Sequence, residues 1–248
     1  MKGIILAGGN GTRLMPLTAV TNKSLLPVYD RPMIYYPLQL MAEAGIEEVL
    51  IVAGGANCGE MMRVLKDGSQ FGFTRLYFTV QENAGGISQA LALAEQFAQG
   101  EKTFVLLGDN LIFGGHVTDA VREFAAHSEG AKVFLKQVPD PERFGIAGIS
   151  DGRIVSIEEK PKAPKSNLAV SGLYLYDASV FDKIRQLKPS ARGELEVTDL
   201  NRLYLEDEQL GYAMLDGKWI DAGTFDSLAE ASEMARQAAE TVQLAVAA

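Results

Sequence analysis

A glycine-rich loop, GGNGTR at residues 8–13, follows the first apolar segment of the chain. Glycines let the backbone approach a ligand closely, and successive N–H groups in such a turn form a concavity that binds anions. Arg13 can add a bidentate contact to phosphate, and Lys23 follows shortly after it. The third glycine of a dinucleotide-binding loop and the Gly-Lys-Ser/Thr of a P-loop are both missing. We therefore expect either a phosphate-binding loop of another kind or a tight structural turn.

Two aspartates stand at the ends of apolar segments that are far apart in the sequence. Asp109 follows the run 103–107, and Asp221 ends the segment Lys218–Asp221. One or two carboxylates plus substrate phosphates are a common way to hold Mg²⁺. Each aspartate could instead cap a helix or form a turn. If both segments are strands, their carboxylates could face each other.

Four basic residues are candidates for binding phosphate, although a single surface lysine or arginine usually has no special role. Arg13 and Lys23 flank the glycine loop. Lys160 follows two glutamates and precedes Pro161, which is an unusual place for a free surface lysine. Arg192 is the fourth candidate.

These residues need a scaffold that brings distant loops together. Short β-branched runs alternate with helical stretches, which predicts an α/β fold with a mixed, mainly parallel sheet flanked by helices. Ligands in such sheets bind beyond the carboxyl ends of the strands. We expect strands at 2–6, 48–53, 75–80, 103–107 and 132–138, and helices at about 32–45, 57–66, 87–97 and 116–127.

The pattern changes from about residue 139, where prolines become frequent and the strands alternate more. We expect strands at 154–158 and 169–176. The prediction is one domain with a core at 1–138 and 218–226, a subdomain or cap of mixed strands at 139–217, and a closing helix at 227–248. The segment 218–221 should return to the main sheet. A capping box at 227–230 should open the helix.

Composition narrows the function classes. The 248 residues carry a net charge of −9, while the first 31 carry +3. An acidic protein with a basic amino terminus favours a small anionic ligand over nucleic acid.

No apolar run is long enough to span a membrane, and no signal peptide is evident. A single cysteine, Cys58, excludes an internal disulfide and favours a cytoplasmic protein. Two histidines make a His-based metal site or catalytic triad a poor fit.

The ordered set of motifs resembles the sugar-1-phosphate nucleotidylyltransferase family, over residues 1 to about 226. The residues of these motifs are most similar to those of the family members that transfer a thymidylyl group to glucose 1-phosphate. The chain resembles a short form of these proteins, without their carboxy-terminal helical extension. The segments that carry the resemblance are GGNGTRLMPLT at 8–18, KSLLPV at 23–28, PMIYYP at 32–37, GDN at 108–110, DPERFG at 140–145, EEKP at 158–161, RGELEVTD at 192–199 and WIDAGT at 219–224.

The resemblance implies a Rossmann-like fold and a Mg²⁺-dependent enzyme. It would transfer a thymidylyl group from dTTP to α-D-glucose 1-phosphate, giving dTDP-glucose and pyrophosphate. The resemblance also implies a homo-oligomer, a dimer or tetramer. The implied metal ligands are Asp109 and Asp221. These two residues, with Arg13, Lys23 and Lys160, form the implied catalytic set.

The implied binding residues fall into two groups. The nucleotide would be held by Leu6, Ala7, Gly8, Gly9, Gly11, Thr12, Arg13, Lys23, Gln81, Gly86 and Asp109. The sugar phosphate would be held by Gly145, Glu159, Lys160, Val170, Gly172, Tyr174 and Arg192. Two stretches depart from the family pattern: the loop 82–85 after Gln81, and Ser24, where many relatives carry a larger polar residue.

Three other functions compete with this one. A nicotinamide-dependent oxidoreductase would need the missing third glycine and an acidic ribose-binding residue. A non-catalytic sugar-nucleotide sensor would have lost Asp109, Asp221 or Arg13. A transferase that uses UTP or ATP in place of dTTP is the nearest rival. It would share the chemistry, in which the phosphate monoester, with a second pKa near 6, attacks without a general base.

Overall fold

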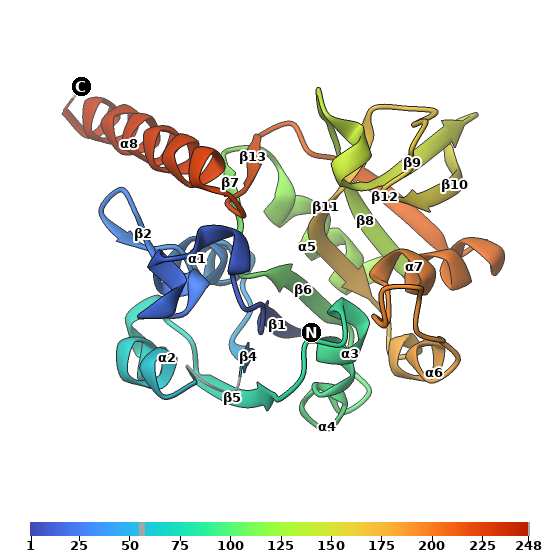
Figure 1. The fold of residues 1–248 in the computed structure, drawn as a ribbon, viewed down its shortest axis with the longest axis horizontal. Helices are drawn as coiled ribbons and strands as arrows, with labels where there is room; N and C mark the ends of the chain where they lie inside the picture. The colour runs from blue at the N-terminus through green and yellow to red at the C-terminus, as the bar shows by residue number, and fades with distance from the viewer. Residues whose placement is uncertain (55–57, 248) are drawn as a thin grey trace.

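A central sheet organises the molecule in the computed structural model (Figure 1). The structure describes residues 1–54 and 58–247, with side chains up to residue 241. Nine strands of this described part form the sheet, with a main path β10-β9-β11-β6-β1-β4-β5 and with β8 joining β11 to β12. Their bounds are β1 Lys2–Ala7, β4 Glu48–Gly54, β5 Arg75–Gln81, β6 Thr103–Leu107, β8 Ala131–Gln137, β9 Gly145–Ser150, β10 Arg153–Glu159, β11 Leu168–Tyr176 and β12 Leu210–Met214.

The strand order explains why the site forms where it does. β1 lies between β4 and β6 and is parallel to both, and β5 continues the parallel set beyond β4. β11 runs antiparallel to β6 and joins the second half of the chain to the same sheet. The mixed, mainly parallel sheet and the strand positions of the first half confirm the sequence prediction. Residues that follow β1, β5 and β6 consequently meet at one edge.

Helices cover both faces of the sheet, because alternate side chains of the strands point to opposite faces. On β1, Ile4 and Leu6 pack into one buried apolar cluster and Ile5 into another. The helices are α1 Tyr35–Glu43, α2 Cys58–Leu65, α3 Ile87–Ala92, α4 Glu95–Ala98, α5 Val117–His127, α6 Val180–Ile184, α7 Val197–Glu206 and α8 Phe225–Ala247. Residue 57 of the expected helix 57–66 and residue 248 of the closing helix lie outside the described residues.

The single helix expected at 87–97 is wrong. The chain forms α3 and α4, and the N–H groups of Leu93 and Ala94 bond to carbonyls three residues back rather than four. This tighter turn places Ala94 and Ala98 in the core, where both are fully buried. The spacing of apolar residues is the same for one continuous helix and for two helices joined by a tighter turn. It therefore could not predict this break.

The expected return of 218–221 to the main sheet is also wrong. The segment forms β13 (Lys218–Asp221), which pairs antiparallel with β7 (Asn110–Phe113) in a separate two-stranded sheet. The segment is a strand, as predicted, but β7 provides its partner directly after β6. A second small ribbon pairs β2 (Pro27–Val28) with β3 (Arg31–Pro32).

The closing helix begins earlier than predicted. α8 starts at Phe225, and the reciprocal cap joins Thr224 and Ser227 rather than Ser227 and Glu230. The Ser227 Oγ accepts a hydrogen bond from the Thr224 N–H at 3.0 Å, and the Thr224 Oγ1 accepts one from the Ser227 N–H at 3.3 Å. Figure 1 shows α8 extending away from the sheet. In the described part of the chain, no helix combines the length and apolar character needed to cross a membrane.

Candidate functional site

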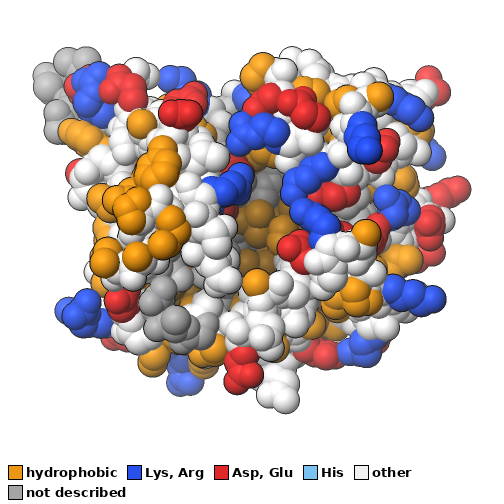
Figure 2. All heavy atoms as spheres, in the orientation of Figure 1, with side chains coloured by type: hydrophobic (Ala, Val, Ile, Leu, Met, Phe, Trp, Pro, Cys, Tyr) orange, Lys and Arg blue, Asp and Glu red, His pale blue; other side chains and the backbone are white. Residues whose placement is uncertain are grey.

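A cleft opens between the two halves of the molecule, and Lys and Arg side chains stand on both of its sides (Figure 2). Three adjoining cavities of about 430, 270 and 360 Å³ make up this cleft, and Gly9, Asp109 and Glu194 line all three. Every residue that the sequence predicts for the site lines at least one of them. The structure therefore brings the whole predicted set together, at the carboxyl ends of the parallel strands.

The glycine loop follows β1 and closes into a short 3₁₀ turn, Thr12–Leu14. Gly11 has φ of 61°, a left-handed conformation that glycine adopts without strain. A Cβ at Gly8 would lie 2.2 Å from the Gln81 Oε1, whereas nothing lies within 4 Å of one at Gly9. The backbone conformation thus favours glycine at Gly11, close packing against Gln81 favours it at Gly8, and Gly9 leaves the backbone open to the cleft.

Pairing of β7 with β13 places Asp109 and Asp221 side by side. Asn110 is the register partner of Asp221, and the Ala222 N–H donates to the Asp109 carbonyl at 2.9 Å. The Asp109 carboxylate forms an ion pair with the buried Lys23 ammonium, and its Oδ1 accepts a hydrogen bond from Asn110 at 2.9 Å. Although burial opposes its ionisation, the charge and hydrogen bond of Lys23 hold the Asp109 pKa below its ordinary value.

Asp221 has the opposite environment. Its Oδ1 is buried and has no hydrogen-bond partner among the described residues. Burial, and then the neighbouring Asp109 charge, raise the Asp221 pKa to about 6. A buried carboxylate oxygen without a donor is costly, and a cation would relieve that cost. Arg13 is also near, because a Cβ at Gly223 would lie 2.7 Å from the Arg13 Nη2 and 3.0 Å from the Asp221 Oδ1.

The two aspartates offer only oxygen ligands, which suit a hard divalent cation such as Mg²⁺. Within residues 1–54 and 58–247, no group of three or more His, Cys, Asp or Glu side chains could hold a metal by itself. The residues present therefore fit an ion whose coordination is completed by water and by ligand phosphates. They do not fit a closed structural metal site.

The largest of the three cavities is built mainly from the second half of the chain. Gly145, Val170, Gly172, Tyr174 and Glu159 line it together with Lys160 and Arg192. The Glu159 Oε2 accepts a hydrogen bond from the Thr198 hydroxyl at 2.6 Å, while Arg192 lies 3.4 Å from its Oε1 and 2.7 Å from the Glu196 Oε2. Burial raises the pKa of Tyr174 far above its ordinary value, so this side chain stays neutral.

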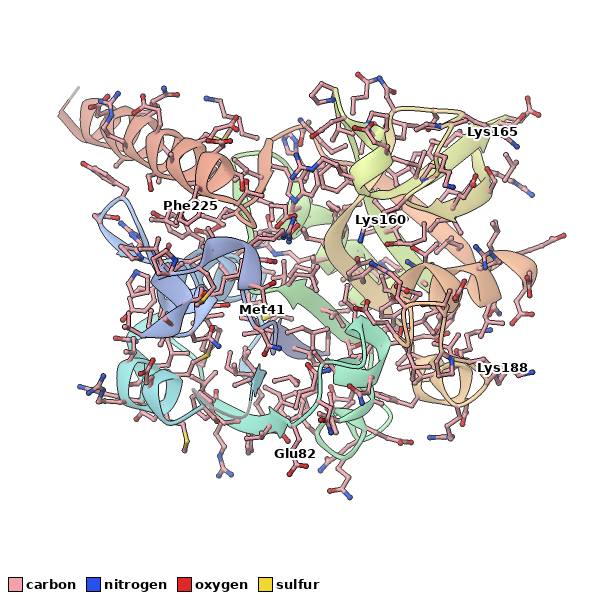
Figure 3. All side chains as sticks on the ribbon, viewed as in Figure 1. Met41, Glu82, Lys160, Lys165, Lys188 and Phe225 are labelled. Carbon is pink, nitrogen blue, oxygen red and sulfur yellow. The ribbon has the colours of Figure 1, made fainter. Side chains whose placement is uncertain are left out.

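Lys160 occupies a strained backbone position directly after β10. Its φ is 42°, and its N–H donates to the Phe144 carbonyl at 3.0 Å. Such strain in a residue other than glycine persists where the surrounding structure fixes it, and this is common at functional sites. The Nζ lies 3.5 Å from Glu159, and Figure 3 shows Lys160 beside β11 near the middle of the molecule.

Gln81 and Gly86 line a different cavity of the cleft from Glu159 and Lys160. Both line the 270 Å³ cavity with Leu6 and Gly8. The Gln81 side chain is buried, and its Nε2 donates to Gln89 at 2.8 Å. Glu82, the next residue, lies at the lower edge of the view in Figure 3, away from the cleft.

The cleft is also lined by residues that the sequence does not single out, and five of them carry polar or aromatic side chains of interest: Asn110, Arg143, Glu194, Thr198 and Trp219. Asn110 is central among them, because its Oδ1 accepts hydrogen bonds from the Gly172 N–H at 3.1 Å and from the Trp219 Nε1 at 2.7 Å. All five lie within the sequence segments that carry the family resemblance. That membership was the signal available, but only the structure shows which residues face the cleft.

Larger cavities occur elsewhere on the described surface. One of about 610 Å³ lies between α1, β7 and α8, and one of about 820 Å³ lies around β10 and β12. Neither contains the glycine loop, the aspartate pair or any other predicted site residue. The chemistry of the side chains therefore identifies the central cleft, although each of its three cavities is smaller than either of these two.

Comparison with known proteins identifies the family that the sequence motifs resemble. Residues 2–238 match the model of a family described as nucleotidyl transferase. The chain is 48% identical over 235 residues to a glucose-1-phosphate thymidylyltransferase of Neisseria meningitidis, covering 94% of this chain and 81% of that protein. It is 41% identical over 239 residues to one of Mycobacterium tuberculosis, covering 95% and 82%.

Solved structures share the fold. A Bacillus anthracis protein described as a glucose-1-phosphate thymidylyltransferase, crystallised with sucrose, has a TM-score of 0.90 at 50% identity, covering 95% of each chain. A UDP-glucose pyrophosphorylase in complex with UDP-glucose has a TM-score of 0.84 at 24% identity, covering 95% of this chain and 98% of that one. The second likeness concerns the fold alone.

Proposed function

Because this chain belongs to the nucleotidyl transferase family, we propose that it transfers a thymidylyl group from dTTP to α-D-glucose 1-phosphate, forming dTDP-glucose and pyrophosphate. Relatives that are 41–48% identical over more than nine-tenths of the chain carry that activity in their names. The observation that carries the proposal is the continuous cleft that joins the glycine loop, the Asp109–Asp221 pair and the Glu159–Lys160 segment.

The nucleotide occupies the two smaller cavities in this proposal. Backbone N–H groups of the glycine loop hold the phosphates, together with Arg13 and Lys23. Gln81 and the backbone at Gly86 read the base. Remaining contacts come from Leu6, Ala7, Gly8, Gly9, Gly11, Thr12 and Asp109, all of which line these cavities.

The sugar phosphate occupies the largest cavity. Glu159 accepts hydrogen bonds from sugar hydroxyls, and its Oε2 is already oriented by Thr198. Lys160 and Arg192 hold the phosphate. Gly145, Val170, Gly172 and Tyr174 shape the walls of this cavity.

Asp109 and Asp221 would hold Mg²⁺ in the complex, and the ion would supply neutralisation of the triphosphate charge. Without a cation, the two carboxylates would repel the nucleotide. The unpartnered Oδ1 of Asp221 supports this assignment.

The chain then acts mainly by positioning and by charge stabilisation. The sugar-phosphate oxygen attacks the α-phosphorus of dTTP in line, and the bond to pyrophosphate breaks. A phosphate monoester is mostly dianionic at neutral pH, so no general base is needed. Lys160 aligns the attacking phosphate, and Arg13 with the loop N–H groups stabilises negative charge that develops on the triphosphate. No covalent enzyme intermediate forms.

The wider organisation follows from the same proposal. Residues 1–138 and 218–226 act as the nucleotide-binding core, 139–217 as the sugar-binding subdomain, and 227–248 as the closing helix. The enzyme works in the cytoplasm as a homo-oligomer, a dimer or tetramer, and has neither nucleic acid nor membrane as a partner.

One experiment tests the assignment. Pyrophosphate release is measured with Mg²⁺ while dTTP, UTP, CTP and ATP are crossed with the 1-phosphates of glucose, galactose and mannose. We expect the highest kcat/KM for dTTP with glucose 1-phosphate. A clear preference for UTP or ATP would support the rival transferase, and no release with any pair would refute the proposal.

A further inference from the structure

The side-chain amide of Gln81 has one orientation that its surroundings impose. Gln81 ends β5 and lines the 270 Å³ cavity, whereas Gln89 lies behind it on α3 and lines none of the three cavities of the cleft. One hydrogen bond joins these two amides to each other, and two more join them to the loop between them. Together they determine which atom of Gln81 is available to a ligand.

The orientation of Gln89 is fixed first. Its Oε1 accepts a hydrogen bond from the Gly85 N–H at 2.9 Å, and a backbone N–H can only donate. The same oxygen lies 2.8 Å from Gln81, so the Gln81 atom that faces it must be the donor Nε2. The Gly86 carbonyl, 3.4 Å from that nitrogen, makes the same demand.

The Gln81 Oε1 is consequently turned away from α3 and toward the glycine loop. A Cβ at Gly8 would lie 2.2 Å from this oxygen, so the oxygen and the loop backbone are neighbours in the wall of the cavity. Reversal of the Gln81 amide would set its carbonyl against two acceptors, the Gln89 Oε1 and the Gly86 carbonyl. Such a reversal is strongly disfavoured.

We infer that Gln89 is a positioning residue that presents Gln81 to the base as a hydrogen-bond acceptor and so selects thymine or uracil over cytosine. Thymine and uracil carry a ring N3–H that donates to such an acceptor. In cytosine the same ring nitrogen is an acceptor, and it would face the Gln81 oxygen without a proton between them. This inference rests on the proposed nucleotide transfer and concerns how its base selectivity arises.

Two variants of matched size separate the orienting role from packing. Gln89→Leu keeps the bulk of the side chain but removes the acceptor, so the Gln81 amide can turn. Gln89→Glu replaces the amide oxygen with a carboxylate oxygen, which can still accept from both Gly85 and Gln81. A third variant reaches the same end by another route, because a Cβ at Gly85 would lie within 2.6 Å of all three amide atoms of Gln89. Gly85→Ala therefore displaces Gln89 without altering it.

The readout is the ratio of kcat/KM for dTTP to that for dCTP, each with glucose 1-phosphate. We expect this ratio to fall about tenfold in Gln89→Leu and in Gly85→Ala, which is the effect of about one hydrogen bond. The ratio should stay at the wild-type value in Gln89→Glu. Thermal melts followed by circular dichroism establish which variants fold. If Gln89→Leu does not fold, the ratios of Gly85→Ala and Gln89→Glu are compared instead.

An unchanged ratio in both Gln89→Leu and Gly85→Ala would overturn the inference, even if overall activity falls. An equal loss of selectivity in Gln89→Glu would also overturn it, since that variant retains the acceptor. The proposed function fails separately, if wild-type enzyme does not use dTTP at all.

Discussion

Removing the charge of Asp221 should stabilise the metal-free protein while it abolishes activity. The Asp221 Oδ1 is buried without a partner, and the Asp221 pKa is raised to about 6 by burial and by Asp109. A shift from an ordinary 3.8 to about 6 corresponds to about 3 kcal/mol of unfavourable free energy for the ionised form in the folded state. Asp221→Asn keeps the shape of the side chain and removes that cost.

The sign of the pH dependence follows from linkage. The folded protein binds the Asp221 proton more tightly than the unfolded chain does. The stabilising effect of this proton is therefore complete below pH 3.8, and it is lost as the pH rises through about 6. The advantage of Asp221→Asn should be greatest at pH 7.5, fall to about half by pH 5, and nearly vanish at pH 4.

Thermal unfolding in the presence of a chelator measures this effect. For a chain of this length we expect Asp221→Asn to melt roughly 6–12 °C above wild type at pH 7.5. Added Mg²⁺ should raise the Tm of wild type and leave that of the variant unchanged. Nucleotidyl transfer by the variant should fall by about 100-fold or more. A variant that melts below wild type at pH 7.5 would show that the Asp221 carboxylate has a stabilising partner, and it would refute the reasoning.

Three other substitutions test separate parts of the cleft. Lys160→Ala should raise the KM for glucose 1-phosphate at least about tenfold and change the KM for dTTP much less, because the lost charge-assisted contact is made to the sugar phosphate only. Saturation curves for both substrates will show which KM changes more. Gly8→Ala should weaken dTTP binding measured by calorimetry, since its Cβ would lie 2.2 Å from the Gln81 Oε1 and would displace that amide. Unimpaired binding would contradict the close packing of the loop against Gln81. Asn110→Leu should lower the free energy of unfolding by about 2–4 kcal/mol in urea titrations, because it leaves two N–H donors without their acceptor. A loss below about 0.5 kcal/mol would show that water replaces the Asn110 oxygen.

The convergence of Asp109 and Asp221 could be predicted from the sequence, but its route could not. Both residues end apolar β-type segments, and the ends of parallel strands share an edge. The partner strand of 218–221 depends on β7, a four-residue strand directly after Gly108-Asp109 that reads as a continuation of the loop. Pairing of such short segments is decided by tertiary contacts and not by local periodicity.

The residues that orient the site through hydrogen bonds are harder to predict from the sequence than its charged groups. Lys160 and Glu159 stand out by type and neighbourhood, whereas Asn110 and Thr198 act through hydrogen bonds to residues more than 35 positions away. Gln89 is another example, because its role depends on which of its two amide atoms faces Gly85. A pattern of residue types carries no information on such orientations.

The ion pairs of the cleft explain how an acidic protein can bind a triphosphate. Lys23 is paired with Asp109, and Arg192 with Glu196, so the cationic groups are held in place by carboxylates in the ligand-free cleft. A polyanion alone would have to compete with these carboxylates, and a divalent cation alone would have to compete with Lys23 for Asp109. In the proposed complex Asp109 would help to hold the cation, and the Lys23 ammonium, no longer needed as the partner of Asp109, would be available to phosphate. We therefore expect the cleft to bind the metal–nucleotide complex more tightly than it binds either component alone.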